Sequence, residues 1–275
     1  MRLSNKAGAI KAVVLDWAGT MIDHGSRAPV IALLRLFDQA GVPISEAEAR
    51  ADMGRAKRDH IRAILAMPRV RETWRQSHGA GPDEDDVTRL HDAVAPIMRE
   101  AARDCADLIP GAAELVVRLR EAGVPIASCT GYTREMMADI LPRAAEQGYA
   151  PDVVVCSGET KEGRPSPLML WKALVELGVW PASACVKVDD ATVGIGEGKA
   201  AGAWTVGIAA SGNGVGLDHM ALFALPQDQR QQRVGEARAA LLAAGADYVL
   251  DSVADLWPVL ETIGARIDAG ERPGA

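Results

Sequence analysis

The sequence predicts an α/β protein in which a doubly wound parallel sheet forms the core and an all-helical domain is inserted after the first strand. Short, continuously apolar segments recur along the chain, which is typical of strands buried on both faces of a parallel sheet. Amphipathic helical patterns separate the later segments, and this alternation predicts a doubly wound arrangement. The segments are AVVLD (12–16), VPIASCT (124–130), DVVVC (152–156), ACVKVDD (184–190) and WTVGIA (204–209).

The composition argues against several classes of protein. The chain has 275 residues, 48% of them hydrophobic, which is enough for one large core or for a core with a smaller satellite domain. Its net charge of −7 offers no basic surface for nucleic acid or an anionic membrane. No apolar segment approaches the roughly 18–20 residues that span a bilayer, and the N-terminal residues lack the apolar stretch of a signal peptide. We therefore expect a cytoplasmic protein with no nucleic-acid or membrane partner.

Roughly 100 residues that carry only helical signals separate the first strand from the second. Helices are predicted over 28–41, 45–53, 55–67 and 83–105. The second of them opens with a capping box formed by Ser45 and Glu48. We interpret this insertion as a cap domain of residues 26–105 over a core formed by residues 1–25 and 106–275.

The rest of the core follows the same alternation and points to one edge of the sheet as the functional site. Helices are predicted over 111–122, 133–147, 166–178, 195–201, 228–243 and 253–267, with a short last strand over 246–250. Ligands of such sheets bind outside the carboxyl ends of the strands. Asp16, Thr130 and Asp190 each lie at such an end, so we expect them to share a site.

Asp16 is the candidate nucleophile. The small residues that follow it, Ala18 and Gly19, would let backbone N–H groups approach an anion closely, and Thr20 adds a hydroxyl. A carboxylate nucleophile splits phosphoryl transfer into two steps through an aspartyl phosphate. The alternative is a strand-end aspartate that only caps a turn. Thr130 has two interpretations as well, as a donor to a phosphoryl oxygen or as the cap of the next helix.

Charged residues near other strand ends predict an anion site and a magnesium site. Arg164, in GRPSP just before a helix, offers a cationic fork for phosphate, although a single arginine of this kind is more often a surface residue. Neighbouring residues of a strand point to opposite faces, so only one of Asp189 and Asp190 is expected to face the site. Asp16, the carbonyl of Ala18 and Asp190 together would form a ligand set that Mg²⁺ prefers.

Lys57 lies on an apolar helix face in the predicted cap. Its spacing in MGRAKRDHIRAIL (53–65) places it beside isoleucine and leucine side chains, with Met53 one turn earlier and His60 one turn later. Burial would lower the pKa of the amine, and a neutral amine condenses with a carbonyl to form an imine. The alternatives are a lysine whose amine reaches solvent at a helix edge and a histidine that is an ordinary polar helix residue.

Four motifs resemble those of the haloacid dehalogenase superfamily over nearly the whole chain. DWAGT, SCTGYTREMM, GRPSP and VKVDD occur in the order and spacing of that superfamily. The resemblance implies a Rossmann-like core in which Asp16 is the nucleophile, Thr130 the hydroxyl of the second motif and Asp190 the metal-binding acid. Arg164 would be the cation of the third motif, which is usually a lysine.

Two positions depart from the usual pattern of the superfamily. Many members have a further acid four positions after the metal ligand, where this chain has Gly194, so the fourth motif rests on Asp190 with Asp189 as a possible substitute. In phosphatases of the superfamily, an aspartate two positions after the nucleophile protonates an alkoxide leaving group, and here that position is Ala18. A protonated imine on Lys57 would remove the need for this acid, because it accepts the electrons of a breaking bond to the adjacent carbon.

The combination of DWAGT, MGxxKxxHIRAI, TGYTREMM and GRPSP is similar to the phosphonoacetaldehyde hydrolase (phosphonatase) family. The resemblance implies hydrolysis of the C–P bond of phosphonoacetaldehyde to acetaldehyde and phosphate, with Mg²⁺ and a Schiff-base lysine, in 2-aminoethylphosphonate degradation. Lys57 would form the imine, His60 would transfer protons, and Met53, Gly131 and Tyr132 would contact the substrate. The family's homodimers form through cap helices, which implies a homodimer here.

Two other functions remain open at this point. The first is a magnesium-dependent phosphomonoester phosphatase or sugar-phosphate mutase, which Ala18 disfavours because alkoxide departure would lack its acid. The second is a non-catalytic protein that binds phosphate compounds, which four motifs in order disfavour.

Overall fold

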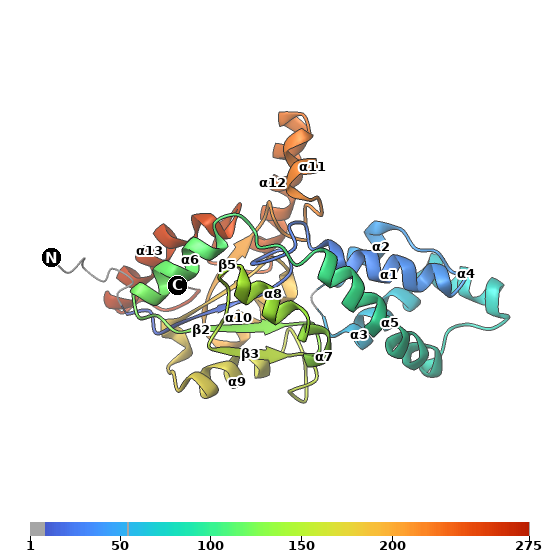
Figure 1. Ribbon diagram of the computed structural model, residues 1–275, viewed down its shortest axis with the longest axis horizontal. Helices are drawn as coiled ribbons and strands as arrows, with labels where there is room; N and C mark the ends of the chain where they lie inside the picture. The colour runs from blue at the N-terminus through green and yellow to red at the C-terminus, as the bar shows by residue number, and fades with distance from the viewer. Residues whose placement is uncertain (1–8, 54, 275) are drawn as a thin grey trace.

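The computed structural model describes residues 9–53 and 55–274. One parallel sheet of six strands runs through the core in the order β3-β2-β1-β4-β5-β6 (Figure 1). The strands are β1 (Ala12–Leu15), β2 (Ile126–Thr130), β3 (Val153–Cys156), β4 (Cys185–Asp189), β5 (Trp204–Ile208) and β6 (Tyr248–Leu250). Every predicted strand is present and every pairing is parallel, which confirms the doubly wound α/β fold.

Helices cover both faces of the sheet, which explains why whole strands are apolar. Val13 and Leu15 of β1 belong to the cluster that includes α6 (Ala112–Glu121), whereas Ala12 and Val14 pack toward α9 (Leu168–Leu177). The other core helices are α7 (Arg134–Met137), α8 (Ile140–Glu146), α10 (Thr192–Ala201), α11 (His219–Ala224), α12 (Gln227–Ala243) and α13 (Leu256–Asp268), with 3₁₀ turns at Ala182–Ala184 and Val253–Asp255. The predicted helix over 133–147 is therefore divided into α7 and α8, and α11 was not predicted.

Of the six helices described between β1 and β2, the first five pack on one another beyond the end of the sheet (Figure 1). They are α1 (Arg27–Gln39), α2 (Glu46–Arg50), α3 (Lys57–Ala66), α4 (Pro68–His78) and α5 (Glu84–Asp104). They occupy the region predicted as the cap, and its boundaries as a domain remain a prediction. The capping box of Ser45 and Glu48 is formed as predicted.

The cap differs from the predicted helices at three places. α2 ends at Arg50 and α3 begins at Lys57, so Met53 lies in the turn between them and not on a helix. The helix α4 was missed, because Pro68 was taken only as the end of the preceding helix. Proline also fits the first position of a helix, where its missing N–H would have no partner in any case, and Pro68 begins α4 there.

Of the helices in the described residues, none is both long and apolar enough to cross a membrane.

Candidate active site

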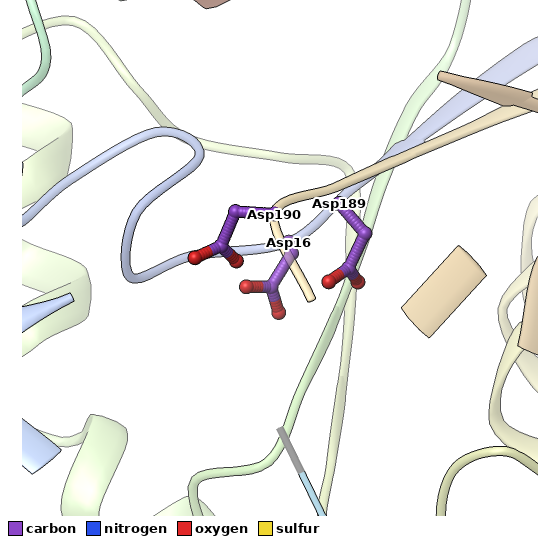
Figure 2. A group of neighbouring side chains, drawn as sticks. All are labelled: Asp16, Asp189 and Asp190. Carbon is purple, nitrogen blue, oxygen red and sulfur yellow. The ribbon is translucent and has the colours of Figure 1, made fainter. Parts of the chain in front are cut away.

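Three aspartates meet where β1 and β4 end. Asp16 follows β1, Asp189 is the last residue of β4 and Asp190 follows it, and one carboxylate oxygen of each lies within 4.8 Å of the others (Figure 2). All three are buried. Alternation along β4 predicts that only one of Asp189 and Asp190 faces the site. Both carboxylates belong to the cluster, but only Asp190 also borders the cavity beside it.

Two glycines make room for the two neighbouring aspartates of this cluster. A Cβ atom on Gly19, which has a φ of 84°, would lie 2.2 Å from Oδ2 of Asp190. A Cβ atom on Gly194 would lie 2.0 Å from the carboxylate of Asp189. A side chain at position 194 would therefore overlap the Asp189 carboxylate where it now lies. This explains why the chain has Asp189 and no acid at position 194.

Arg164 connects the candidate nucleophile to a buried charge network. Its Nη2 donates to Oδ1 of Asp16 at 2.8 Å and to the carbonyl of Cys129. Its other nitrogens lie 3.4 Å from Oδ2 of Asp189 and 3.2 Å from Oε2 of Glu197. Lys187 Nζ lies 3.1 Å from both of these carboxylates. Sequence reasoning missed Lys187 and Glu197, although a lysine inside an apolar strand and a glutamate in a glycine-rich helix are both unusual.

The charges of this network suit a divalent cation. This group contains four buried carboxylates, those of Asp16, Asp189, Asp190 and Glu197, and two cationic groups, those of Arg164 and Lys187, while Arg50 attracts Asp190 from outside the group. Two net negative charges without water are unfavourable, and one divalent ion would balance them. Burial and the neighbouring carboxylates raise the pKa of Asp190 well above its usual value. Burial, followed by Asp189, raises the pKa of Asp16 to about 6, although Arg164 opposes this.

Asp16 and Asp190 line a small cavity that also receives side chains from the cap. Its volume is about 30 Å³. It is bordered by Asp16, Ala18, Ser26, Pro29, Met53, Arg55, Lys57, Thr130, Gly131, Tyr132, Arg164, Asp190 and Ala191. Most of the predicted site residues therefore come together here. Ser26, Pro29, Arg55 and Ala191 were not predicted. The position of the first three depends on how the cap lies over the sheet, whereas Ala191 directly follows Asp190.

The backbone N–H groups of Gly19 and Thr20 bond within the turn, whereas the Thr20 hydroxyl is buried without a hydrogen-bond partner in the described residues, so its role as an anion donor stays a prediction. The N–H of Gly19 donates to the carbonyls of Ile22 and Asp23, and that of Thr20 donates to the carbonyl of Trp17. Neither residue borders the cavity, so Gly19 serves the site by accommodating Asp190.

Lys57 is buried at the first turn of α3. Only 4% of its surface is exposed, and this burial lowers the pKa of the amine from 10.5 to about 8, with no charged neighbour opposing it. A neutral amine is therefore available far more often than in an exposed lysine. Lys57 also borders a larger open cleft of about 780 Å³ against Ser157 and Gly163 of the core, so this residue borders both the cleft and the cavity of the aspartates.

His60 follows Lys57 by three residues on α3, and it does not border the cavity. It is fully buried, and burial, followed by the Lys57 charge, lowers the pKa of its imidazole to about 3. The ring is therefore neutral at ordinary pH. Neither ring nitrogen makes a hydrogen bond of normal geometry in the described residues, although the carbonyls of Ala49 and Ala51 lie close enough to raise the pKa slightly.

Thr130 and Tyr132 border the cavity from the end of β2. The Thr130 hydroxyl accepts the N–H of Tyr132 at 3.1 Å, which leaves its own proton free to donate. The Tyr132 hydroxyl is buried without a hydrogen-bond partner in the described residues. An unpartnered buried hydroxyl costs free energy unless a ligand satisfies it. Gly54, the glycine of the MGxxK motif, lies outside the described residues.

Comparison with known proteins agrees with this geometry. The family model described as haloacid dehalogenase-like hydrolase matches residues 10–202. The fold and the aspartate cluster therefore define a haloacid dehalogenase-like hydrolase.

Relatives with high sequence identity identify the family within this class of hydrolases. The phosphonoacetaldehyde hydrolase of Paraburkholderia xenovorans is 49% identical over 96% of this chain and 99% of the relative. The phosphonoacetaldehyde hydrolase of Nitratidesulfovibrio vulgaris is 43% identical over 97% of this chain and 95% of the relative. The crystal structure of a phosphonoacetaldehyde hydrolase-like protein from Oleispira antarctica is 44% identical, covers 97% of both chains and superposes with a TM-score of 0.95. The chain belongs to the phosphonoacetaldehyde hydrolase family and is an enzyme.

Proposed function

We propose that this enzyme hydrolyses the C–P bond of phosphonoacetaldehyde, with Lys57 as the imine-forming amine and Asp16 as the nucleophile toward phosphorus. The observation that carries the proposal is the position of Lys57. It is a buried amine with a pKa lowered to about 8, and it borders the same small cavity as Asp16 and Ala18. The names of the relatives support the same substrate.

The first half of the reaction would build the leaving group. The neutral Lys57 amine adds to the aldehyde carbon, and the adduct takes up one proton and loses water to give a protonated imine. The Asp16 carboxylate then attacks phosphorus, the P–C bond breaks, and its electron pair moves toward the imine to give an enamine. The carbon therefore never departs as a free carbanion. The reaction then needs no acid at position 18 to protonate the leaving group, so Ala18 is compatible with it.

The second half would release both products. Protonation of the enamine carbon restores the imine of acetaldehyde, and water hydrolyses it to acetaldehyde and the free Lys57 amine. A second water cleaves the aspartyl phosphate to phosphate and the Asp16 carboxylate. The neutral His60 ring, next to Lys57, would transfer protons during imine formation and hydrolysis.

Arg164, Thr130 and a magnesium ion would bind the phosphoryl group. Mg²⁺ would be held by Asp16, the Ala18 carbonyl and Asp190, where it would neutralise charge on the phosphoryl oxygens. Asp190 is favoured as the ligand over Asp189, because both Arg164 and Lys187 already pair with Asp189. Tyr132, Met53 and Gly131 would enclose the substrate.

The biological setting is part of the same proposal. We propose that the enzyme acts in the cytoplasm in the degradation of 2-aminoethylphosphonate and that it forms a homodimer through the cap helices. Large, well-exposed apolar side chains in the described residues lie on core helices such as α9 and α11 and not on the cap. A cap-mediated dimer would therefore be polar, and light scattering of the purified protein would measure its mass.

The decisive experiment measures acetaldehyde and phosphate released from phosphonoacetaldehyde, first with Mg²⁺ and then with a chelator. Equal, metal-dependent release of both products is expected. Borohydride should trap the substrate on Lys57, and Lys57→Arg should lose both trapping and turnover while it keeps the positive charge. Near-normal turnover of Lys57→Arg would refute the imine role. Efficient hydrolysis of simple phosphomonoesters would favour a phosphatase.

A further inference from the structure

The loop of residues 211–217, which follows β5, packs tightly on the metal-binding acid. The N–H of Asn213 donates to Oδ2 of Asp190 at 2.7 Å. A Cβ atom on Gly212 would lie 2.7 Å from the Cβ of Asp190. The Ser211 hydroxyl donates to the carbonyl of Gly19 at 2.9 Å, so the same loop also supports the turn after the nucleophile. A shift of this loop would therefore displace Asp190.

Arg50, the last residue of α2, reaches from the cap to this loop. Its Nη1 donates to Oδ1 of Asn213 at 3.0 Å and to the carbonyl of Gly25 at 2.9 Å. Its Nη2 donates to the carbonyl of Gly216 at 2.8 Å. The guanidinium lies so close to the loop that a Cβ atom on Gly216 would be 2.6 Å from its Cζ. One side chain of the cap thus binds both the linker after β1 and the loop beside Asp190.

The position of Arg50 in the chain connects this contact to the imine amine. Only the short turn between α2 and α3 separates Arg50 from Lys57, and Met53 and Arg55 of that turn border the cavity. The Arg50 contact therefore fixes the end of α2 from which this turn leaves. An ion pair between the cap and this region joins Arg27 to Asp218. Both of those side chains are more than 40% exposed, so that pair contributes little.

We propose that Arg50 is a positioning residue that holds the cap closed over the cavity and, through Asn213, fixes the loop that holds Asp190. This proposal rests on the proposed function, because closure matters only if Lys57 must reach a substrate bound at Asp16. The rigid fork of arginine is required, since its separate nitrogens bind Asn213 and Gly216 at once. A lysine would supply a single ammonium group, which could not bind Asn213 and Gly216 in the same way at the same time.

The test replaces Arg50 by methionine, which keeps the length of the side chain and removes its donors. Groups that orient a ligand of a metal typically change activity by roughly 10- to 100-fold, and a loss of that size in kcat/KM is expected for Arg50→Met. Borohydride trapping on Lys57 should fall, and hydrogen exchange of loop 211–217 should accelerate because its contacts with the cap are lost. Arg50→Lys should recover only part of each effect.

The matched control is Arg69→Met. Arg69 is also a cap arginine, but it bonds Glu48 and the carbonyl of Pro43 within the cap. Arg69→Met should therefore leave borohydride trapping on Lys57 and hydrogen exchange of loop 211–217 unchanged. Asn213→Ala provides a second route if Arg50→Met folds poorly, because it removes the acceptor of Arg50 and keeps the backbone N–H that binds Asp190.

The outcomes separate this proposal from the proposed function. If Arg50→Met and Asn213→Ala keep wild-type exchange in loop 211–217 and wild-type kcat/KM, Arg50 has no positioning role. If the wild-type enzyme itself releases no acetaldehyde and is not trapped by borohydride, the proposed function fails. Hydrogen exchange of the loop then decides on its own whether Arg50 fixes it.

Discussion

At the scale of single residues, Lys57 opposes the stability of the fold that places it. Its pKa in the folded protein is about 8, against 10.5 for an ordinary lysine. Below about pH 8 both the folded and the unfolded chain hold the proton, so the folded state carries the full penalty of a buried ammonium. As pH rises from about 8 to 10.5 the folded state loses the proton first, and the penalty disappears.

Lys57→Met is therefore expected to stabilise the protein while it abolishes imine formation. The predicted gain in the free energy of unfolding is roughly 1–3 kcal/mol at neutral pH, and it should shrink toward the upper end of the titration range. Urea denaturation at neutral pH and near pH 10 measures both values. A variant that is less stable than the wild type at neutral pH would contradict the assignment of Lys57 as an unpaired buried amine.

The same lowered pKa predicts how the reactivity of Lys57 depends on pH. Only the neutral amine is a nucleophile, and at pKa about 8 its neutral fraction approaches a plateau one to two pH units above that value. His60 stays neutral throughout, because its pKa is about 3. We expect labelling of Lys57 by an amine-selective acylating reagent to rise with a midpoint near pH 8, as followed by mass spectrometry. The exposed Lys161 serves as an internal reference for the reagent. A midpoint above about 10 would remove the physical basis for a neutral Lys57.

At the scale of elements, the junction of β4 and α10 depends on Gly194. Gly194→Ala would place a methyl group on the Asp189 carboxylate, and overpacking of this kind typically costs about 1–3 kcal/mol. We expect lower stability in thermal unfolding and weaker Mg²⁺ dependence of activity. The matched control is Gly235→Ala in α12, where a Cβ atom meets nothing within 4 Å. It should be neutral or should stabilise by roughly 0.5–1 kcal/mol. Equal effects of the two alanines would show that Asp189 does not need the space.

The elements themselves were largely predictable, because their signals are local. Continuous apolar segments identified the strands, and the spacing of Lys57 identified a buried helix face that the structure confirms. The errors lie where a local rule has two outcomes. Pro68 both ends one helix and begins the next. Alternation along β4 separates Asp189 from Asp190 only in part, because both carboxylates reach the cluster although only Asp190 borders the cavity.

At the scale of the whole molecule, the remaining parts of the site were not predictable because they depend on contacts between distant segments. Arg50 is close in sequence to Lys57, yet its partners Asn213 and Gly216 come from a loop more than 160 positions away. Lys187 and Glu197 become part of the site only because Arg164 bonds both Glu197 and Asp16, and Lys187 in turn pairs with Glu197. No spacing rule connects such residues, whereas the motifs around Asp16 and Arg164 were found through resemblance.

The net charge of this buried network makes the stability of the whole enzyme depend on a divalent cation. Its carboxylates exceed its cationic groups by two, so an ion that binds only the folded state should stabilise it. A ligand at a hundredfold excess over its dissociation constant contributes about 2.7 kcal/mol. Mg²⁺ should therefore raise the melting temperature in the absence of substrate, and a chelator should reverse the change. Asp190→Asn should melt higher than the metal-free wild type, because it removes one repelling charge and keeps an acceptor for Asn213, and it should lose the response to Mg²⁺. If Mg²⁺ shifts Asp190→Asn as much as the wild type, the ion stabilises the enzyme at another place and the aspartate cluster is not its site.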